Sequence, residues 1–379
     1  MGRRANNEGS ISKVKGRNLY VGRYHVDAPD GTRKRKALYA PTRQEAHDKM
    51  VEAMGDAAKG MVYHDENLEL GDYLDGWLAD SVQDTVRERT FERYEQICRV
   101  HVKPALGRIK LRKLTPAHLR GLYRAKLDAG LAPRTVQYIH TTMHKALKQA
   151  VLDGLVPRNV AQAVKSPKPT AKEIRVLDDG EIRRFLDAAR GERLEALYVL
   201  AISTGMRRGE LMGLTWRDVD LDRGKLSLRR SLSFTKDGPK FTDTKRKSSR
   251  RSIKLSQTAV DALRSHRVRQ NEERLGVGSE WQDNDLVFPD ERGQPLTPRT
   301  LYRVSFKRVL KRAGLPETIT FHEATRHTCA TMLLGRGVHP KIVQELLGHA
   351  TISITLDTYS HVLPGMDDGL ADTIDEALA

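Results

Sequence analysis

Four polar residues near the C-terminal end of this chain have the types and the spacing of a reactive site. They are His322, Arg326, His349 and Tyr359. Arginine stays charged and its fork binds two oxygens, histidine can donate or carry a proton, and tyrosine offers a hydroxyl nucleophile. The stretch carries no cluster of carboxylates that could hold Mg²⁺. This combination suits attack of a hydroxyl on a phosphodiester, with cations stabilising the charge that develops.

Two helices separated by a short break must position these residues. Gly335, Gly337 and Pro340 mark the break, and Gly348 can take the positive backbone angle of a helix cap. Apolar residues recur at helical spacing on both sides and would bury one face of each helix: Met332, Leu333, Leu334, Ile342, Val343, Leu346 and Leu347. The polar residues therefore fall at helix ends, where side chains can converge on a ligand.

A second polar box lies upstream, in residues 201–211. There Thr204 and Gly205 precede Arg207, and Glu210 follows three residues after the arginine. A basic stretch, residues 244–254, lies between the two boxes. The pattern is T-G-x-R-x-x-E-L, a basic hairpin, a His/Arg pair, and L-G-H followed ten residues later by Tyr. This pattern resembles the tyrosine recombinase (phage integrase) family over about residues 177–363.

The resemblance implies a site-specific DNA recombinase that integrates or excises a mobile element. Tyr359 would attack a scissile phosphate, leaving a 3′-phosphotyrosine and a free 5′-hydroxyl. Arg207 and Arg326 would hold the non-bridging oxygens and stabilise the transition state. His349 would donate a hydrogen bond to the phosphate, and Glu210 would support the surroundings of Arg207.

The residues that move protons leave two alternatives open. Matching the basic stretch to the corresponding stretch of the family selects Lys245 as the acid that protonates the departing 5′-oxygen, with Lys247 as the alternative. His322 would act on the tyrosine proton, but it stands four residues before Arg326 where the family has three, and Glu323 occupies the usual place. One extra residue turns a helical side chain by about 100°. We expect a bulge or loop to absorb it and to keep His322, because a carboxylate would partly cancel the positive charge of the site.

The composition indicates a polyanionic partner. The 379 residues include 66 Lys and Arg against 49 Asp and Glu, a net charge of +17 that favours nucleic acid over a membrane surface. No apolar run approaches the roughly 18 residues of a membrane span, and the N-terminus lacks the hydrophobic region of a signal peptide. Two cysteines, Cys98 and Cys329, are too few for a disulfide framework. We therefore expect a cytoplasmic protein, associated with the nucleoid when bound to DNA.

Residues 1–62 are typical of a small three-stranded sheet backed by a helix. Three β-like runs, 10–15, 19–26 and 32–39, are separated by turn residues, and a capping box at 42–45 opens a helix to about residue 59. Basic residues lie on these strands, and a sheet of this size can enter a major groove. Arg23, Arg33 and Arg35 are the candidate DNA contacts. In integrases with such an appendage, the segment resembles an arm-type DNA-binding domain.

The remaining chain predicts two further domains and a linker. Residues 63–164 read as helices throughout, with one helix expected to stop at Pro104 and another to begin at Thr115-Pro116. This segment resembles the helical core-binding domain of the family. Residues 165–176, with two prolines and three lysines, would be the linker. Residues 177–379 would form the catalytic domain with a C-terminal tail, and a hairpin formed by residues 225–234 and their return would carry the catalytic lysine. The predicted fold class is multidomain α+β: a small sheet plus helix, an all-α domain, and a mainly α catalytic domain with a β-hairpin.

The resemblance also implies partners. A protomer would clamp double-stranded DNA at core sites and bind arm-type sites through residues 1–62, and strand exchange between two duplexes implies a homotetramer. A DNA-bending host protein and a directionality factor would assist. Because the chemistry is reversible phosphoryl transfer, the reaction would need no ATP, no metal and no other cofactor.

Two other classes of function fit part of the pattern. A non-enzymatic, sequence-specific DNA-binding regulator would also be basic and helical, but it has no use for a tyrosine ten residues after Gly-His. A metal-dependent nuclease or hydrolase could use His322, His327 and Cys329, but this cluster lacks a fourth ligand of obvious spacing. Covalent trapping on a nicked duplex separates the three classes, because only a recombinase stays attached to DNA.

Overall fold

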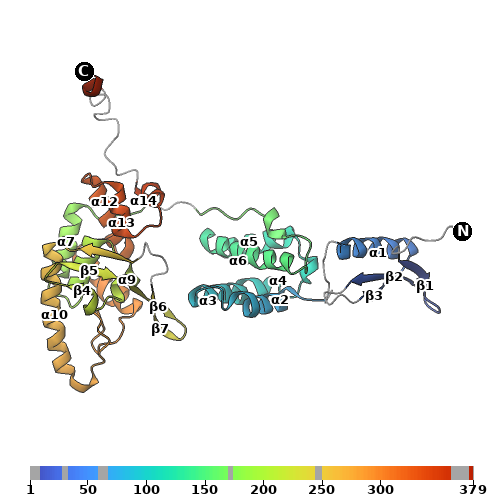
Figure 1. The fold of residues 1–379 in the computed structure, drawn as a ribbon, viewed down its shortest axis with the longest axis horizontal. Coiled ribbons are helices and arrows are strands. Elements are labelled where there is room, and N and C mark those ends of the chain that lie inside the picture. The colour runs from blue at the N-terminus through green and yellow to red at the C-terminus, as the bar shows by residue number, and fades with distance from the viewer. Residues whose placement is uncertain are drawn as a thin grey trace. The chain divides into compact units, whose positions relative to one another are not determined.

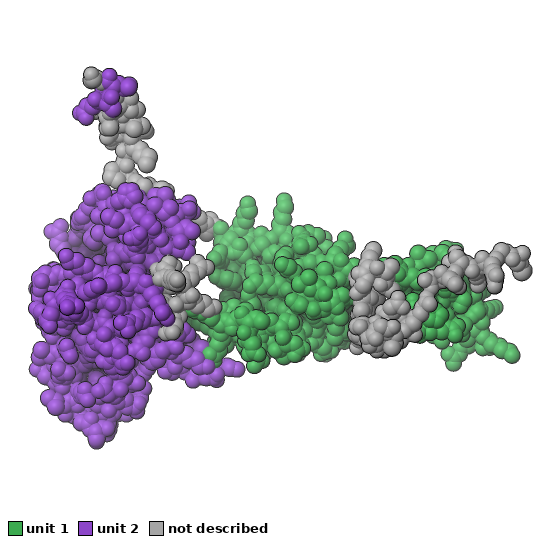
Figure 2. Space-filling view, in the orientation of Figure 1, with its two compact units in different colours: residues 1–171 green, residues 172–379 purple. Residues whose placement is uncertain are grey.

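The computed structural model describes residues 9–27, 33–58, 67–169, 174–243, 250–359 and 375–378. The chain divides into two compact units, residues 1–171 and 172–379 (Figure 2). Most of the described residues are helical, and small antiparallel sheets complete a multidomain α+β fold (Figure 1). Among the described helices, none is both long and apolar enough to cross a membrane. The domain boundaries expected inside the first unit stay predictions.

The N-terminal segment forms the expected sheet and helix. Strands β1 (Ser10–Lys13), β2 (Tyr20–Asp27) and β3 (Arg33–Ala40) make an antiparallel sheet in the order β1-β2-β3, and helix α1 (Arg43–Ala58) follows. Thr42 caps this helix by accepting a hydrogen bond from the Glu45 backbone N–H at 3.2 Å. Helix α1 packs closely on β2, since a Cβ atom at Gly22 would lie 3.2 Å from the Ala46 carbonyl oxygen. The three strands and the helix predicted from the sequence are therefore confirmed.

The helical part of the first unit is a bundle with its own core. Its main elements are α2 (Leu70–Gly76), α3 (Glu88–Ile97), α4 (Lys103–Leu106), α5 (Pro116–Asp128) and α6 (Pro133–Leu152). Apolar side chains from these helices meet in one cluster, whose most buried members include Leu70, Leu74, Ile97, Leu119, Ile139 and Met143. Burial of this set holds the helices together.

The prediction that a helix stops at Pro104 is wrong. Helix α3 continues into a wide π-helical turn, Cys98–Val102, which ends where the Lys103 N–H donates to the Cys98 carbonyl. Helix α4 begins there, and Pro104 lies in its first turn. Proline is tolerated at that position because the N–H it lacks would have no helical partner.

The second unit places its helices around one large core. Helices α7 (Asp179–Ala189), α8 (Glu195–Thr204), α10 (Gln257–Val277) and α11 (Lys307–Arg312) contribute to it together with strands and connecting segments, and Phe185, Tyr198, Phe306 and Phe321 form an aromatic group within it. A capping box begins α7, because Asp178 accepts from the Glu181 N–H at 2.7 Å and Glu181 accepts from the Asp178 N–H at 3.2 Å.

The sheet region of the second unit differs from the single hairpin that we expected. The predicted strand 225–234 is interrupted at Arg229 and becomes β5 (Lys225–Leu228) and β6 (Arg230–Thr235). These strands belong to different sheets: β5 pairs with β4 (Val219–Asp220) and β8 (Arg251–Lys254), whereas β6 pairs with β7 (Gly238–Asp243). Lys236 and Asp237 form the turn that joins β6 to β7.

The C-terminal helices follow the predicted break. Helix α12 (Thr328–Gly335) and helix α13 (Pro340–Leu347) flank Gly337, which has φ +76°, and α14 (Ile352–Tyr359) follows the left-handed cap at Gly348. The predicted helix break and cap are confirmed. Of the C-terminal tail, only residues 375–378 are described, and they are helical.

We predict that Thr115→Ala destabilises the helical bundle by about 1 kcal/mol, because Thr115 accepts from the His118 N–H at the start of α5. Hydrogen-exchange mass spectrometry of the α5 peptide should show faster exchange. The matched control is Thr141→Ala on the exposed face of α6, where the hydroxyl only bonds back to the Gln137 carbonyl. Because alanine favours a helix interior, this control should leave exchange unchanged or slower. Equal exchange in the two variants would contradict the assignment of the cap.

Candidate active site

Arg207 follows a turn that only glycine fits. Helix α8 ends at Gly205, which has φ +59°, and a Cβ atom there would lie 2.5 Å from Leu347 Cδ2. Arg207 is extended and begins α9 (Arg208–Met212). The Glu210 carboxylate accepts from the Arg207 N–H at 2.9 Å and from Nη1 at 3.0 Å. The T-G-x-R-x-x-E spacing thus describes a glycine turn followed by an arginine braced by its own helix.

Glu210 also holds a second arginine. Arg251, at the start of β8, donates from Nη2 to Oε2 at 3.0 Å and from Nη1 to Oε1 at 3.3 Å, and the two side chains are only 8% and 4% exposed. Burial alone would raise the pKa of Glu210, but the charge and hydrogen bonds of Arg251, and then those of Arg207, outweigh it and leave the pKa lowered. The carboxylate is therefore ionised between two guanidinium groups.

Three arginines meet the last carbonyls at the C-terminal end of α13. Arg251 Nε donates to the Leu346 oxygen at 2.6 Å, Arg326 Nη2 to the Leu347 oxygen at 2.9 Å, and Arg207 Nη2 to the Gly348 oxygen at 3.1 Å. These carbonyls have no partner inside the helix and carry its negative partial charge, so cations stabilise them. The L-G-H motif therefore forms a helix end that gathers three guanidinium groups from distant parts of the chain.

Arg326 is the most enclosed of the candidate phosphate-binding residues. It is 5% exposed, and its Nη1 also donates to the Gly205 carbonyl at 2.7 Å. Burial, followed by the charge of Arg207, lowers the pKa of Arg326 to about 10, which leaves it charged at neutral pH. Arg326 thus ties the glycine turn before Arg207 to the end of α13.

A π-helical turn absorbs the extra residue between His322 and Arg326. Residues Glu323–His327 form this turn, in which hydrogen bonds join residue i to residue i+5. The bulge keeps His322 beside the arginines: burial, and then Arg326, lower the pKa of His322 to about 4. Glu323 instead accepts from the Thr320 N–H at 2.7 Å, closing a reciprocal bond with the Thr320 hydroxyl. Glu323 is thus bonded to the backbone that begins the turn, whereas the charge of Arg326 acts on His322; which of the two serves the reaction stays a prediction.

His349 and Tyr359 each have one defined partner. His349 Nδ1 lies 2.8 Å from the buried Thr355 hydroxyl, and burial, followed by Arg326 and Arg207, lowers its pKa to about 4. Tyr359 ends α14, is 2% exposed, and its hydroxyl lies 2.7 Å from His327 Nδ1. Burial raises the pKa of Tyr359 to about 12, against an opposing effect of Arg326.

Some predicted residues lie apart from this cluster or outside the described residues. Lys245 and Lys247 fall in residues 244–249, which are not described. Arg23 and Arg35 lie on one face of the N-terminal sheet, because Arg23 pairs with Ala37 and Arg35 with His25. Arg23 Nη1 donates to the Ser12 hydroxyl at 2.9 Å, and Arg35 is exposed. The side chain of Arg33 is outside the described residues.

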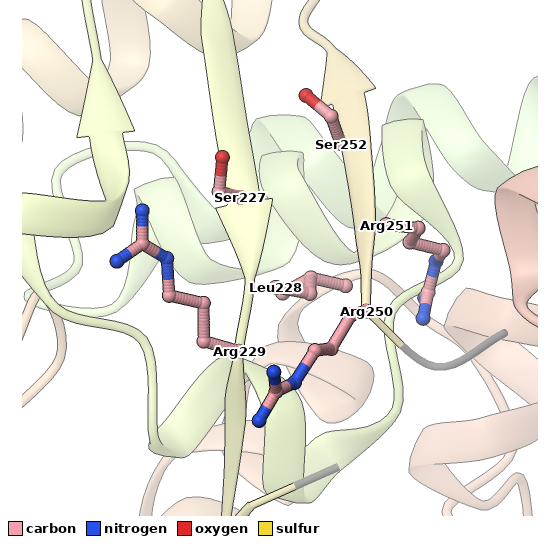
Figure 3. A pocket seen from close by; sticks show the side chains of 6 residues that line it. All are labelled: Ser227, Leu228, Arg229, Arg250, Arg251 and Ser252. Atoms are coloured by element: carbon pink, nitrogen blue, oxygen red, sulfur yellow. The ribbon is translucent and has the colours of Figure 1, made fainter. Parts of the chain in front are cut away.

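The sequence analysis missed three residues of the site. They are Arg251, which holds Glu210; His327, which contacts the tyrosine hydroxyl; and Thr355, which contacts His349. Arg251 had a signal, because it lies in the basic stretch where a strand begins, but nothing in the sequence separated it from Arg250. Arg229, Arg250 and Arg251 all line a cleft of about 540 Å³. Figure 3 shows that Arg250 extends toward Arg229, whereas Arg251 extends to the other side of its strand. The described residues contain no group of three or more His, Cys, Asp or Glu side chains placed to hold a metal.

We predict that Glu210→Gln lowers the stability of the second unit by about 3–5 kcal/mol, because it leaves the buried Arg251 without a counter-charge. Chemical denaturation followed by tryptophan fluorescence measures the loss. Asp187→Asn is the matched control, since its ion pair with Arg190 is exposed on both sides and should change stability little. A Glu210→Gln protein as stable as this control would show that the carboxylate charge is unnecessary.

We further predict that the second unit loses stability as the pH falls from about 6.5 to about 4. The pKa values of His322 and His349 are about 4 in the folded protein, below the value of about 6.5 in an unfolded chain. Between these two pH values the unfolded state therefore binds more protons than the folded state. The contribution of the neutral histidines to stability is fully present only above about pH 6.5. Calorimetry of the protein with His322→Gln and His349→Gln should show a smaller fall in the thermal midpoint between pH 7.5 and 5. If the thermal midpoint of the substituted protein falls as much as that of the unchanged protein, the loss of stability comes from other groups, such as buried His266.

Comparisons with known proteins agree over most of the chain. The profile of the Phage integrase family matches residues 175–365, and that of the phage integrase N-terminal SAM-like domain matches residues 69–127. A tyrosine recombinase XerC-like protein from Caldanaerobacter subterraneus subsp. tengcongensis is 32% identical over 362 residues, covering 90% of this chain and 92% of the relative.

Solved integrases share the fold. The Tn1549 transposon integrase in complex with a circular intermediate DNA superposes with a TM-score of 0.68 and 22% identity, over 82% of this chain and 100% of that structure. A lambda integrase tetramer bound to a Holliday junction gives a TM-score of 0.57 and 20% identity, over 96% and 99% of the two chains.

These matches decide between the enzyme and the DNA-binding regulator that the sequence left as alternatives. The family profile covers half of the chain and includes Arg207, Arg326, His349 and Tyr359, and the 32% identical relative extends over nearly the whole chain. The recombinase prediction is confirmed. The chain belongs to the phage integrase family and is a tyrosine recombinase, an enzyme that cuts and rejoins DNA.

Proposed function

We propose that Tyr359 is the nucleophile of a site-specific recombination reaction and that the phosphate binds at the end of α13. The observation that carries this proposal is the convergence of Arg207, Arg326 and Tyr359 on one helix. The two arginines bond to consecutive carbonyls at its end, and Tyr359 packs in the same small apolar cluster as Val343 and Leu347 of that helix. Attack on the scissile phosphate would form a 3′-phosphotyrosine and release a 5′-hydroxyl.

The arginines would hold the two non-bridging oxygens of the phosphate. The side chain of Arg207 is 39% exposed, so it can reach a ligand without leaving Glu210. Arg326 is fixed by two carbonyls, and such preorganised donors stabilise developing charge without rearranging during the reaction. His349 would donate to the phosphate from Nε2, since its Nδ1 faces Thr355.

Proton transfer involves residues on both sides of the phosphate. Lys245, or Lys247 as its alternative, would protonate the departing 5′-oxygen. His322 lies among Arg207, Arg208 and Arg326, whose charges and its own burial keep it neutral. We expected His322 to act on the tyrosine proton, but the Tyr359 hydroxyl lies 2.7 Å from His327 Nδ1 instead, so we propose that His322 serves beside the phosphate.

The arrangement of several DNA sites follows from the domain organisation. We infer that residues 63–164 and 177–379 clamp core-site DNA, that residues 165–176 link them, and that residues 1–62 bind arm-type sites through Arg23, Arg33 and Arg35. The tetramer of lambda integrase on a Holliday junction supports a homotetramer on DNA. The integration or excision of a mobile element would then involve a DNA-bending host protein and a directionality factor, in the cytoplasm and at the nucleoid.

We predict that Tyr359→Phe retains DNA binding but forms no covalent complex with a nicked core-site duplex, because the variant lacks the attacking oxygen. Denaturing electrophoresis of labelled DNA detects the complex. Tyr39→Phe is the matched control, since this exposed tyrosine lies on the N-terminal sheet and the short duplex carries no arm-type site. Formation of a covalent complex by Tyr359→Phe would show that another residue is the nucleophile.

A further inference from the structure

The Tyr359 hydroxyl is held by a histidine to which the sequence assigned no part in recombination. His327 Nδ1 lies 2.7 Å from the hydroxyl oxygen, and the two rings are 5.7 Å apart between centroids. Tyr359 is 2% exposed and packs against Ala330, Leu334 and Leu347. The phenol is therefore fixed in position with His327 as a hydrogen-bond partner.

The π-helical turn explains why two histidines can serve one site. Because its hydrogen bonds join residues five apart, His322 and His327 lie one turn apart, and their ring centroids are 6.4 Å from each other. In an α-helix, five residues turn a side chain well away from its starting direction. The inserted residue therefore leaves His322 beside the arginines and His327 beside the tyrosine.

The charge around His327 sets its protonation state. Burial, and then the charge of the adjacent Arg326, lower its pKa, against an opposing effect of Glu323. Among the described residues, the charged and titratable groups that act on the histidine–tyrosine pair are Arg326, Glu323, His322, His349 and Cys329. A neutral imidazole with its hydrogen on Nε2 presents a lone pair on Nδ1, which is the atom that faces the phenol.

We propose that His327 is the proton acceptor of Tyr359 in cleavage and its proton donor in rejoining, an inference that rests on the proposed function. As the tyrosine oxygen bonds to phosphorus, its hydrogen passes to His327 Nδ1, and the bond from phosphorus to the 5′-oxygen breaks. The departing 5′-oxygen takes its proton from the separate acid. In rejoining, the 5′-oxygen bonds to phosphorus as its proton returns to that acid, the bond from phosphorus to the tyrosine oxygen breaks, and His327 returns its proton to that oxygen. The histidine ends neutral, so each cycle balances.

A pair of substitutions separates this role from mere positioning. His327→Asn places an amide oxygen near the position of Nδ1, so it can keep the hydrogen bond but cannot take the proton at neutral pH. His327→Phe loses both. The substrate is a nicked core-site duplex with sulfur in place of the 5′-bridging oxygen, because this leaving group needs no acid and isolates activation of the nucleophile.

We predict that both variants form the covalent complex about 100-fold more slowly than the unchanged protein at pH 7. The rate of the unchanged protein should level off above the pKa of His327, whereas the rate of His327→Asn should keep rising with pH to 9. His339→Asn, a substitution at an exposed histidine that caps α13, is the matched control and should behave like the unchanged protein. A His327→Asn protein with the rate and pH profile of the unchanged protein would overturn the proposal.

Two further measurements keep the test decisive. Nitrogen-15 NMR of histidine-labelled, unsubstituted protein should show His327 neutral at pH 7 with its hydrogen on Nε2; a hydrogen on Nδ1 would overturn the proposal even if the variants fail to fold. Tyr359→Phe distinguishes failure of the nucleophile assignment from failure of this inference. If Tyr359→Phe abolishes the complex and His327→Asn does not slow it, only the role of His327 is wrong.

Discussion

The site depends on one buried carboxylate. Arg207, Arg251 and Arg326 all reach the end of α13, and among their hydrogen-bond partners in the described part of the chain only Glu210 carries a full negative charge. With the helix end contributing roughly −0.5 charge, three guanidinium groups and one carboxylate leave a surplus of about +1.5. Mutual repulsion of this kind is tolerated only where the geometry fixes each cation, and it leaves the site complementary to an anion such as a phosphodiester.

The same helix organises the nucleophile. The end of α13 receives the arginines, while Val343 and Leu347 on its body contribute to the cluster around Tyr359. Gly348 lets the chain turn from α13 toward α14, and a Cβ atom at this position would lie 2.7 Å from Arg251 Nη1. The missing side chain of Gly348 therefore lets Arg251 approach, and its left-handed backbone directs α14, the helix that ends in Tyr359.

Local sequence patterns predicted the parts of the fold that depend on neighbouring residues. The helix break near Gly337, the cap at Gly348, the helix cap at Thr42 and the three N-terminal strands all follow from short-range chemistry. The parts that could not be predicted depend on distant partners. Gly205 is required because Leu347 packs against it, and Arg251 differs from Arg250 only because Glu210 and Leu346 lie on its side. The continuation of the helix through Pro104 was not predicted, because a π-helical turn before the proline has no simple sequence signal.

The π-helical turn at Glu323–His327 also bears on how such chains are recognised. A helix that can widen by one residue keeps the side chains before and after the insertion on the same face, so the distance between motif residues along the sequence can change while their positions in space do not. A search pattern with a fixed interval between the histidine and the arginine would reject this chain at its most informative segment. The motif is therefore defined by the positions of its side chains in space, which the backbone can keep when one residue is inserted, and not by a fixed number of residues between them.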